Sequence, residues 1–498
     1  MKWYCILSLA FNTSLVLSIF IKPAFSINNY TCEKPDTLII NYPQDLNFFI
    51  PQNHAYHQTL TLKLFMSQAH YDEVHKRKDN GISEIFLTCT HALDIIRRID
   101  RLTLGIPKIV YLVGWQYNGH DSKYPAWFEG NEKLKRPEDN NTLESLKWLM
   151  HEATKHNTTV SLHINMFDAY EDSPLWETYL ENDIIGRNED GSLRACEWGY
   201  PISFAREWET GFAQKRIDSL CNILPIQRAG TIHIDAFHTW PPVPVFSDDG
   251  SFRIDLAKGV VSPNLNFTIE DETEAQRQIF RYWAAKGVDV TSESVDFLRE
   301  TAFEGYQAMS WWFNGLNNYL RWPAAYYTGG RDNSVWGRLF GTSMHGEDII
   351  RKDPVILAGF SRQFAEQTAV WYFLNRLERL YLINSPEYKS VQFSDNVRTT
   401  LDRDHFTVMM GDALLVDNHD VFIPALWMDN PSILVYSRNG YQEKLWKLPE
   451  GWKKERKVKL SVVSDAGISE TVFVKVRSGT IKLSLKNDQT ILLEKTRL

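Results

Sequence analysis

The sequence has few cysteines and lacks the common signatures of metal, nucleotide and serine chemistry. Only five of its 498 residues are Cys, and the spacing of Cys32, Cys89, Cys196 and Cys221 fits no zinc motif. The chain contains no H-E-x-x-H motif and no G-x-S-x-G elbow, and no glycine-rich phosphate loop follows its first predicted central strand. These absences argue against zinc hydrolases, elbow-type serine hydrolases and dinucleotide-binding enzymes.

Long runs of positive charge are also missing. The formal net charge is −8 and the isoelectric point is about 6.0, so nucleic acid is not expected as a partner. No repeat of solenoid period and no low-complexity tract occurs. Hydrophobic residues make up 43% and charged residues 23% of the chain, which is typical of a folded protein. The length of 498 residues predicts two or more domains.

After the N-terminus, no apolar stretch is long enough to span a membrane. Residues 1–26 combine Lys2, a long apolar stretch and the small-x-small sequence Ala24-Phe25-Ser26, which predicts a cleaved signal peptide. The alternative is an uncleaved anchor, which the polar residues 12–14 disfavour. We therefore expect a secreted or periplasmic protein, free of the membrane once the signal is removed. The four cysteines that remain could form up to two disulfides, whose pairing stays open.

Strands and helices alternate through the middle of the chain. Strand-like runs at 108–115, 159–167, 231–237, 288–294 and 308–315 are separated by helical patterns at 141–156, 207–224 and 271–287. This order is typical of an α/β fold with a parallel sheet, and at this length it predicts a (β/α)8 TIM-like barrel. An open doubly wound sheet is the alternative.

The two ends of the chain have different patterns. Short alternating strands from about residue 386 predict a C-terminal antiparallel β-sandwich. Strand-like pieces before the barrel predict a small N-terminal β-region. We therefore divide the chain into a signal peptide at 1–26, an N-terminal β-region at 27–84, a catalytic barrel at 85–385 and a β-sandwich at 386–498.

Polar residues follow four of the predicted barrel strands. Since the active site of a barrel lies at the C-terminal ends of its strands, these side chains are candidates for one site. They are Trp115, Gln116, His120 and Asp121 after the first strand, His163, Asn165, Asp168 and Tyr170 after the second, and Asp235 and Glu293 after the next two.

Two carboxylates at neighbouring strand ends suit glycoside cleavage. One carboxylate attacks or supports the anomeric carbon, and the other carries a proton for the leaving oxygen. Each residue also has a simpler interpretation. An Asp after a strand is often a turn or cap residue, and a single His inside a strand is often part of the core. His120 and Asp121 could form half of a metal site, but the sequence shows no third ligand, so we expect no metal and no cofactor.

The segments "GWQYNGHDSKYPAW", "HINMFDAY" and "IHIDAF", together with the Glu293 segment, resemble the catalytic barrel of endo-α-N-acetylgalactosaminidases and the related exo-acting enzymes, glycoside hydrolase families 101 and 129. The resemblance covers roughly residues 105–350. It implies a retaining glycoside hydrolase acting on α-linked N-acetylgalactosamine of mucin-type O-glycans. By the same resemblance Asp235 is the nucleophile, Glu293 is the acid/base, and Asp121 and His163 contact the sugar.

The sequence differs from the family at two places. Ser294-Val295 follow Glu293 where the family often has Trp-Gly, and an insertion at about 241–270 separates the two carboxylates. We expect Phe237, His238 and Trp240 to form the wall around Asp235. We also expect exo action, because this chain lacks large accessory modules and the insertion could close one end of the pocket.

Another α-glycosidase, such as an α-galactosidase, and a non-catalytic carbohydrate-binding protein remain alternatives. The partner is a glycan or glycoprotein, and the oligomeric state is left open.

Overall fold

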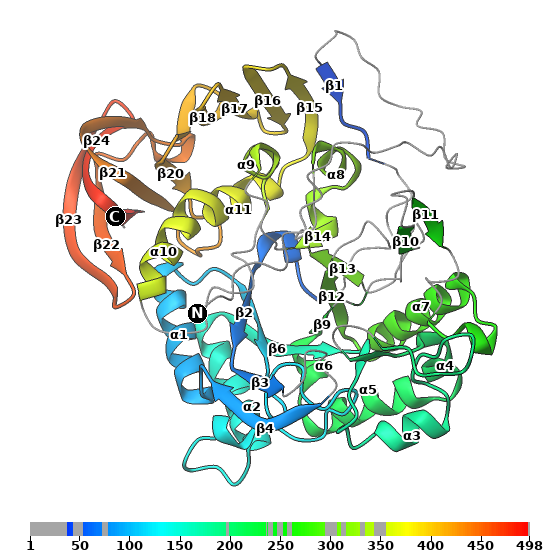
Figure 1. Cartoon of the computed structure of the whole chain (residues 1–498). Helices are drawn as coiled ribbons and strands as arrows, with labels where there is room; N and C mark the ends of the chain where they lie inside the picture. Colours follow the sequence, from blue (N-terminus) through cyan, green and yellow to red (C-terminus); the bar gives the residue numbers. More distant parts are fainter. Residues whose placement is uncertain are drawn as a thin grey trace.

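The computed structural model combines a parallel sheet, the helices around it and a C-terminal antiparallel β-sandwich region (Figure 1). It describes residues 37–42, 53–71, 78–195, 199–235, 237, 243–246, 252–255, 261–293, 306–309, 315–328, 334–342 and 355–496. The predicted signal peptide lies outside these residues, as do Cys32, Cys196, His238 and Trp240. Cys89 and Cys221 are free thiols.

The parallel sheet has seven strands in the order β14-β13-β12-β9-β6-β5-β2, so each strand pairs with the next in chain order. Their bounds are β2 Leu60–Phe65, β5 Lys108–Val113, β6 Thr158–Asn165, β9 Thr231–Asp235, β12 Asp289–Glu293, β13 Tyr306–Met309 and β14 Tyr327–Thr328. Five of them overlap the strands predicted for the barrel, β2 comes from the predicted N-terminal β-region, and β14 was not predicted. The predicted parallel sheet is therefore confirmed.

The two outermost strands of this sheet approach each other. The hydroxyl oxygens of Thr61 on β2 and Thr328 on β14 lie 3.0 Å apart in a buried hydrogen bond, so the sheet curls back toward its first strand. Seven strands belong to this sheet within the described residues, and closure by an eighth strand stays a prediction.

Side chains alternate between the two faces of the parallel strands, as β geometry requires. On β9, Ile232 and Ile234 join the main hydrophobic core beneath the helices. Thr231, His233 and Asp235 therefore face the opposite side, the interior of the curled sheet. Strands β6 and β12 alternate in the same way, which makes the interior polar. By this alternation, the carboxylate at the end of β9 faces the polar interior of the sheet and not the hydrophobic core.

Helices cover the outer face of the sheet (Figure 1). The predicted helix at 207–224 divides in two at Gly211, whose φ of 76° is in the left-handed region that favours glycine. α7 starts with a capping box in which Thr268 and Asp271 exchange hydrogen bonds. The helices are α1 Cys89–Leu102, α2 Thr142–Ala153, α3 Trp176–Glu181, α4 Phe204–Glu209, α5 Phe212–Ile223, α6 Ile226–Ala229, α7 Ile269–Ala285, α8 Leu316–Arg321, α9 Val335–Phe340, α10 Val355–Gln363 and α11 Ala369–Asn375. Within the part of the chain that the structure describes, none is long and apolar enough to cross a membrane.

The N-terminal region contributes to both sheets. β1 (Thr37–Ile39) pairs antiparallel with β15 (Arg379–Asn384) of the C-terminal sheet. β2 belongs to the parallel sheet, and it leads directly into a hairpin of β3 (Ser67–Tyr71) and β4 (Asp79–Ile85). The chain therefore enters the parallel sheet before residue 85, and the domain boundaries themselves stay predictions.

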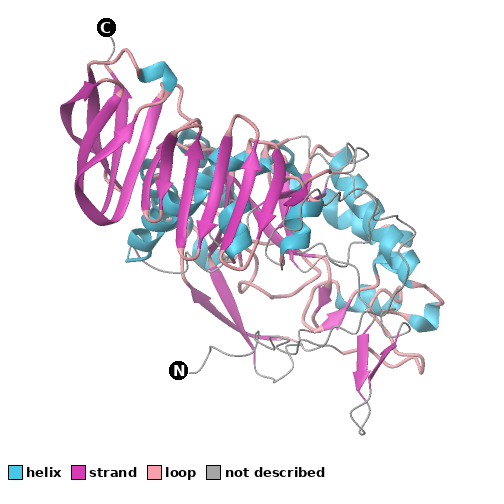
Figure 2. Ribbon diagram, turned by 90° about the horizontal axis from the view of Figure 1, so that it is seen from above, coloured by secondary structure: helices cyan, strands magenta, loops and turns pink. Residues whose placement is uncertain are grey.

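The C-terminal region is an 11-stranded antiparallel sheet that begins with β1 and β15. β21 and β24 are 16 residues long, and their pairing shifts between Tyr441 and Lys444. A second hydrophobic core, which contains Phe422 and Trp446, forms where the sheet turns over on itself (Figure 2). The other strands are β16 Tyr388–Phe393, β17 Val397–Asp402, β18 His405–Met410, β19 Ala413–Asp417, β20 Asp420–Pro424, β21 Ser432–Lys447, β22 Lys457–Ser464, β23 Gly467–Arg477 and β24 Thr480–Lys495.

Candidate active site

Asp235 lies at the C-terminal end of β9, and its side chain is 19% exposed above a buried histidine. The Nε2 atom of His163 is 3.5 Å from Oδ2 of Asp235. Burial alone would raise the pKa of Asp235, but His163, His120 and Lys63 together hold that pKa well below its usual range. Asp235 is therefore an ionised carboxylate that remains accessible from the mouth of the sheet.

Three histidine rings form a continuous column beneath and beside Asp235. The ring centroids of His163 and His233 are 5.0 Å apart in a stacked arrangement, and those of His120 and His163 are 5.2 Å apart, edge to face. A hydrogen bond of 2.9 Å joins Nδ1 of His233 to the Thr291 hydroxyl on β12. Burial lowers the pKa of both His163 and His233. Packing thus fixes the imidazole that contacts Asp235.

The loop after β5 brings His120 and Asp121 to the site. Nε2 of His120 is 3.4 Å from Oδ1 of Asp121, and the Tyr71 hydroxyl donates to the backbone carbonyl of Asp121 at 2.7 Å. A Cβ atom on Gly114 would lie 1.9 Å from the carbonyl oxygen of Ser67, so this loop packs tightly against β3. The segment G-x-Q-x-x-G-H-D-S therefore combines glycines that permit close packing with two side chains for the site.

Three other predicted site residues are occupied by structural contacts. The Trp115 indole is buried and donates to the His163 carbonyl at 3.1 Å. Gln116 donates to the Tyr124 hydroxyl at 3.0 Å. Asn165 donates to Oδ2 of Asp168 at 2.6 Å and accepts two backbone N–H groups of its own loop. These residues shape the site from behind, and their direct contact with a substrate stays a prediction.

A buried ion pair holds the outer side of the β5 loop. The Arg216 guanidinium on α5 is 2.7 Å from the Glu207 carboxylate on α4, and both side chains are almost completely buried. Arg216 also donates to the Pro125 carbonyl at 2.9 Å and lies over the Trp127 ring. The loop is thereby anchored to two helices as well as to β3.

Strand register places Glu293 at the level of Asp235. Ser292 of β12 pairs with Ile234 of β9 in parallel register, so Glu293 follows at the same height as Asp235 on the neighbouring strand. The Ser292 hydroxyl donates to the Ile234 carbonyl at 2.7 Å and accepts from the Phe237 N–H at 3.2 Å, which holds the end of β9. The side chain of Glu293 lies outside the described part of the structure.

Phe237 does not line the site as predicted. Its ring is fully buried against Phe204 of α4 and Phe280 of α7, with centroid distances of 4.8 and 5.3 Å. The prediction was wrong because the chain leaves the interior of the sheet immediately after Asp235 and turns toward the helices.

Sequence reasoning missed two contributors to the site. Tyr71 on β3 packs against Tyr170, with ring centroids 6.3 Å apart, and burial raises the pKa of Tyr71 far above its usual range. Lys63 on β2 is 1% exposed, and it faces the interior because it alternates with the core residues Leu62 and Leu64. The signal for Lys63 was present as a lysine within the apolar run LTLKLF.

The donor atoms of His120, His163 and Asp235 lie within 4.8 Å of one another. Two imidazoles and one carboxylate are ligands that suit a zinc ion, but this group joins His120 to His163 and Asp235, and not to Asp121 as the sequence suggested. The metal-free site stays a prediction.

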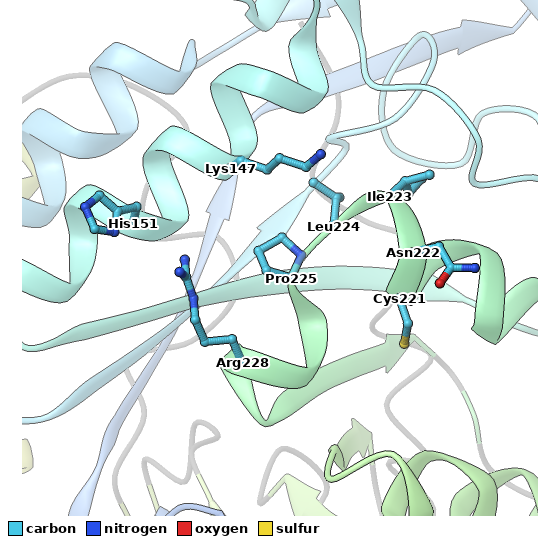
Figure 3. Close-up of a pocket in the computed structure, with 8 residues that line it drawn as sticks. All are labelled: Lys147, His151, Cys221, Asn222, Ile223, Leu224, Pro225 and Arg228. Carbon is cyan, nitrogen blue, oxygen red and sulfur yellow. The ribbon is translucent and has the colours of Figure 1, made fainter.

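A separate pocket with about 360 Å³ of space lies between α2 and the α5–α6 segment (Figure 3). Its lining includes Lys147, His151 and Arg228 but no carboxylate. These elements precede the N-terminal ends of β6 and β9, so this pocket lies toward the opposite end of the strands from Asp235. It therefore cannot supply the paired carboxylates of a glycosidase.

Comparison with known proteins adds a family match. Residues 69–297 match the sequence model of the endo-alpha-N-acetylgalactosaminidase family, a range that includes Asp121, His163, Asp235 and Glu293. This confirms the resemblance seen in the sequence and supports a glycoside hydrolase domain over this range. No curated protein matches the chain.

Comparison with solved structures matches the chain to the alpha-N-acetylgalactosaminidase NagBb from Bifidobacterium bifidum in its GalNAc complex. It is 13% identical, has a TM-score of 0.46, and the alignment covers 71% of this chain and 57% of that one. The alpha-amylase of Geobacillus thermoleovorans complexed with acarbose is 9% identical, with a TM-score of 0.42 and coverage of 90% and 100%. The chain thus spans little more than half the length of the first of these structures.

Proposed function

We propose that this glycoside hydrolase is a retaining enzyme that removes α-linked N-acetylgalactosamine from mucin-type O-glycans. The observation that carries this proposal is the ionised, accessible carboxylate of Asp235 at the end of a central strand, within the matched family domain. Asp235 is the nucleophile, and Glu293, at the same height on the neighbouring strand, is the acid/base.

The reaction proceeds in two displacements. A carboxylate oxygen of Asp235 attacks the anomeric carbon while the bond to the leaving oxygen breaks, and Glu293 gives its proton to that oxygen. Water then attacks the same carbon, Glu293 accepts a proton from it, and Asp235 is released. Two inversions give a product of retained α configuration.

The spacing of the strands favours retention over inversion. Neighbouring strands lie about 4.8 Å apart, whereas the two carboxyl groups are about 5–5.5 Å apart in retaining enzymes and about 6.5–9.5 Å apart in inverting ones. Adjacent positions on β9 and β12 therefore suit a mechanism with no room for water between the carboxylates.

Asp121, His120 and His163 bind hydroxyl groups of the reacting sugar. Their polar atoms converge beside Asp235 and are held by the packed β5 loop and by the histidine column. Buried groups of this kind penalise a substrate that lacks the matching hydroxyl, because they would be left without a partner.

Three finer features belong to the same proposal. The parallel sheet closes as an eight-stranded barrel, which the hydrogen bond between Thr61 and Thr328 supports. Residues 1–26 direct secretion. We infer action on terminal sugars from the length of the insertion after β9, which holds the hairpin of β10 (Val243–Phe246) and β11 (Phe252–Asp255) and would limit one end of the pocket.

A panel of aryl α-glycosides tests the proposed substrate. We expect the highest kcat/KM on α-N-acetylgalactosaminide, lower values on α-galactoside, and little release of an intact disaccharide from β-galactosyl-1,3-α-N-acetylgalactosaminide. Preference for α-galactoside would favour an α-galactosidase, preferential release of the disaccharide would contradict exo action, and no turnover of any member would favour a binding protein.

A further inference from the structure

Positive charge is concentrated at the C-terminal end of an acidic protein. Residues 444–498 contain thirteen Lys and Arg against six Asp and Glu, which leaves a net charge of −15 on residues 1–443. Five of the seven residues in the segment 453–459, KKERKVK, are basic. Short basic segments of this kind are typical of sites for polyanions.

The strand register gathers four of these cations on one side of the β22–β23 pair. Lys457 lies directly opposite Lys475, and Lys459 lies opposite Phe473. The intervening residues Val458 and Val474 pack toward the second hydrophobic core. Strand alternation therefore places a common set of residues on the outer side. We call this surface the basic face: Lys457, Lys459, Phe473, Lys475 and Arg477.

The basic face is unfavourable for the isolated fold. Like charges directly opposite each other weaken a sheet. Lys459 forms an ion pair with Glu494 at 2.7 Å, but among the described residues no carboxylate lies within ion-pair distance of Lys475 or Arg477. Phe473 is 60% exposed, and the Lys457 ammonium lies 4.9 Å from its ring centroid. An anionic ligand would relieve the repulsion and cover the ring.

We propose that the basic face binds a sulfated or carboxylated polysaccharide. Successive outward side chains along a strand are about 7 Å apart, which gives two short rows of cations for the charges of a linear polymer. The Phe473 ring offers a flat surface to the apolar side of a sugar. This inference is independent of the chemistry at Asp235.

Shape and charge favour a flexible polymer over other polyanions. A rigid nucleic-acid duplex or a planar bilayer would bring further negative charge toward the acidic remainder of the protein. Insertion into a bilayer also needs several apolar side chains on one surface, and Phe473 is the one large apolar residue of the basic face. A flexible chain can follow the two strands alone.

Charge reversal on the full-length protein tests the proposal, with heparin as the sulfated probe. In K475E/R477E we expect the affinity for heparin to fall by about tenfold or more, and the slope of log K against log salt to flatten by roughly one to two units, because two charge contacts are lost. F473A should weaken binding several-fold with an unchanged slope. Thermal unfolding and aryl glycosidase activity of each variant check that the fold is intact.

The matched control is K147E/R228E, which makes the same change in net charge at the pocket of Figure 3. It should bind heparin like the wild type. The proposal is overturned if K475E/R477E keeps wild-type affinity or if K147E/R228E loses as much. It is also overturned if a DNA duplex or vesicles rich in phosphatidylserine bind the basic face more tightly than heparin does.

Discussion

At the scale of single residues, the site depends on the negative charge of Asp235, which burial alone would disfavour. Asp235 is ionised because cationic and polar neighbours outweigh its desolvation. His163 is the nearest of these neighbours, and its ring is held between His120 and His233. The chemistry at Asp235 therefore depends on a residue that a single strand pattern would assign to the core.

Replacement of His163 by Gln should raise the pKa of Asp235, because burial then acts with less opposition. The nucleophile must be deprotonated, so the acidic limb of the kcat/KM profile should move to higher pH and activity should be lost first at low pH. The pH dependence of kcat/KM is the measurement. A variant that lost stability but kept the wild-type acidic limb would show that His163 is only a core residue.

Glu272 on α7 should make the free energy of unfolding depend on pH. Its buried carboxylate accepts hydrogen bonds from the Ser203 hydroxyl at 2.6 Å and the Ala205 N–H at 3.0 Å, and burial raises its pKa from 4.5 to about 7. The folded protein therefore holds a proton that the unfolded chain releases between these values. The contribution of Glu272 to stability is therefore most favourable below pH 4.5 and declines as pH rises toward 7, by at most about 3 kcal/mol.

Substitution of Glu272 by Gln should remove this part of the pH dependence of the unfolding free energy. Glu274→Gln is the control on the same helix, because Glu274 is half exposed and lies in an ion pair with Arg277. Denaturant unfolding across the range from pH 4.5 to 7 is the measurement. If the unfolding free energy of the wild type and of Glu272→Gln changed equally with pH, Glu272 would not be the group responsible for this pH dependence.

At the scale of elements, the β5 loop is held by backbone contacts that leave no space for a side chain. Gly114 has a φ of 71° and would bring a Cβ atom within 1.9 Å of the Ser67 carbonyl oxygen. Gly191 has a similar φ of 83°, but a Cβ atom added there would have no neighbour within 4 Å. The two glycines therefore separate the effect of crowding from that of backbone conformation.

Gly114→Ala should displace the loop that carries His120 and Asp121, and so reduce kcat/KM by about 100-fold or more, since small displacements of positioned groups have effects of this size. Gly191→Ala carries only the strain of a positive φ and should keep near wild-type activity. Steady-state kinetics with thermal unfolding of both variants provide the comparison. Similar activity in the two alanine variants would show that the close packing of the loop has no role in catalysis.

At the same scale, alternation explains what the sequence could predict. Polar and apolar residues alternate from Thr231 to Asp235, and this pattern predicts both the strand and the face toward which the Asp235 carboxylate points. It could not show that the Asn165 side-chain amide forms hydrogen bonds within its own loop, because these bonds depend on the turn geometry after β6. Nor could it show that β1 pairs with β15, more than 300 residues away.

At the scale of the whole molecule, the strand order assembles a site from separate segments. His120 comes from the loop after β5, His163 from β6 and Asp235 from β9, and these three strands are neighbours in the sheet, which brings the donor atoms within 4.8 Å of one another. The sequence predicted these residues one at a time, but it did not reveal their contact distances or the contribution of Lys63 and Tyr71. The net charge of −15 on residues 1–443 contrasts with the basic face on β22 and β23.

In the proposed reaction, Asp235 forms a covalent bond to the anomeric carbon of the sugar. An activated fluorosugar analogue of N-acetylgalactosamine that slows hydrolysis of the glycosyl-enzyme should add one sugar mass to the intact protein, and mass spectrometry of its proteolytic peptides should place that mass on Asp235. Asp235→Asn should remain unlabelled and lose almost all turnover. Label on another carboxylate, or turnover to a product of inverted configuration without any labelled protein, would show that Asp235 is not the nucleophile of a retaining enzyme.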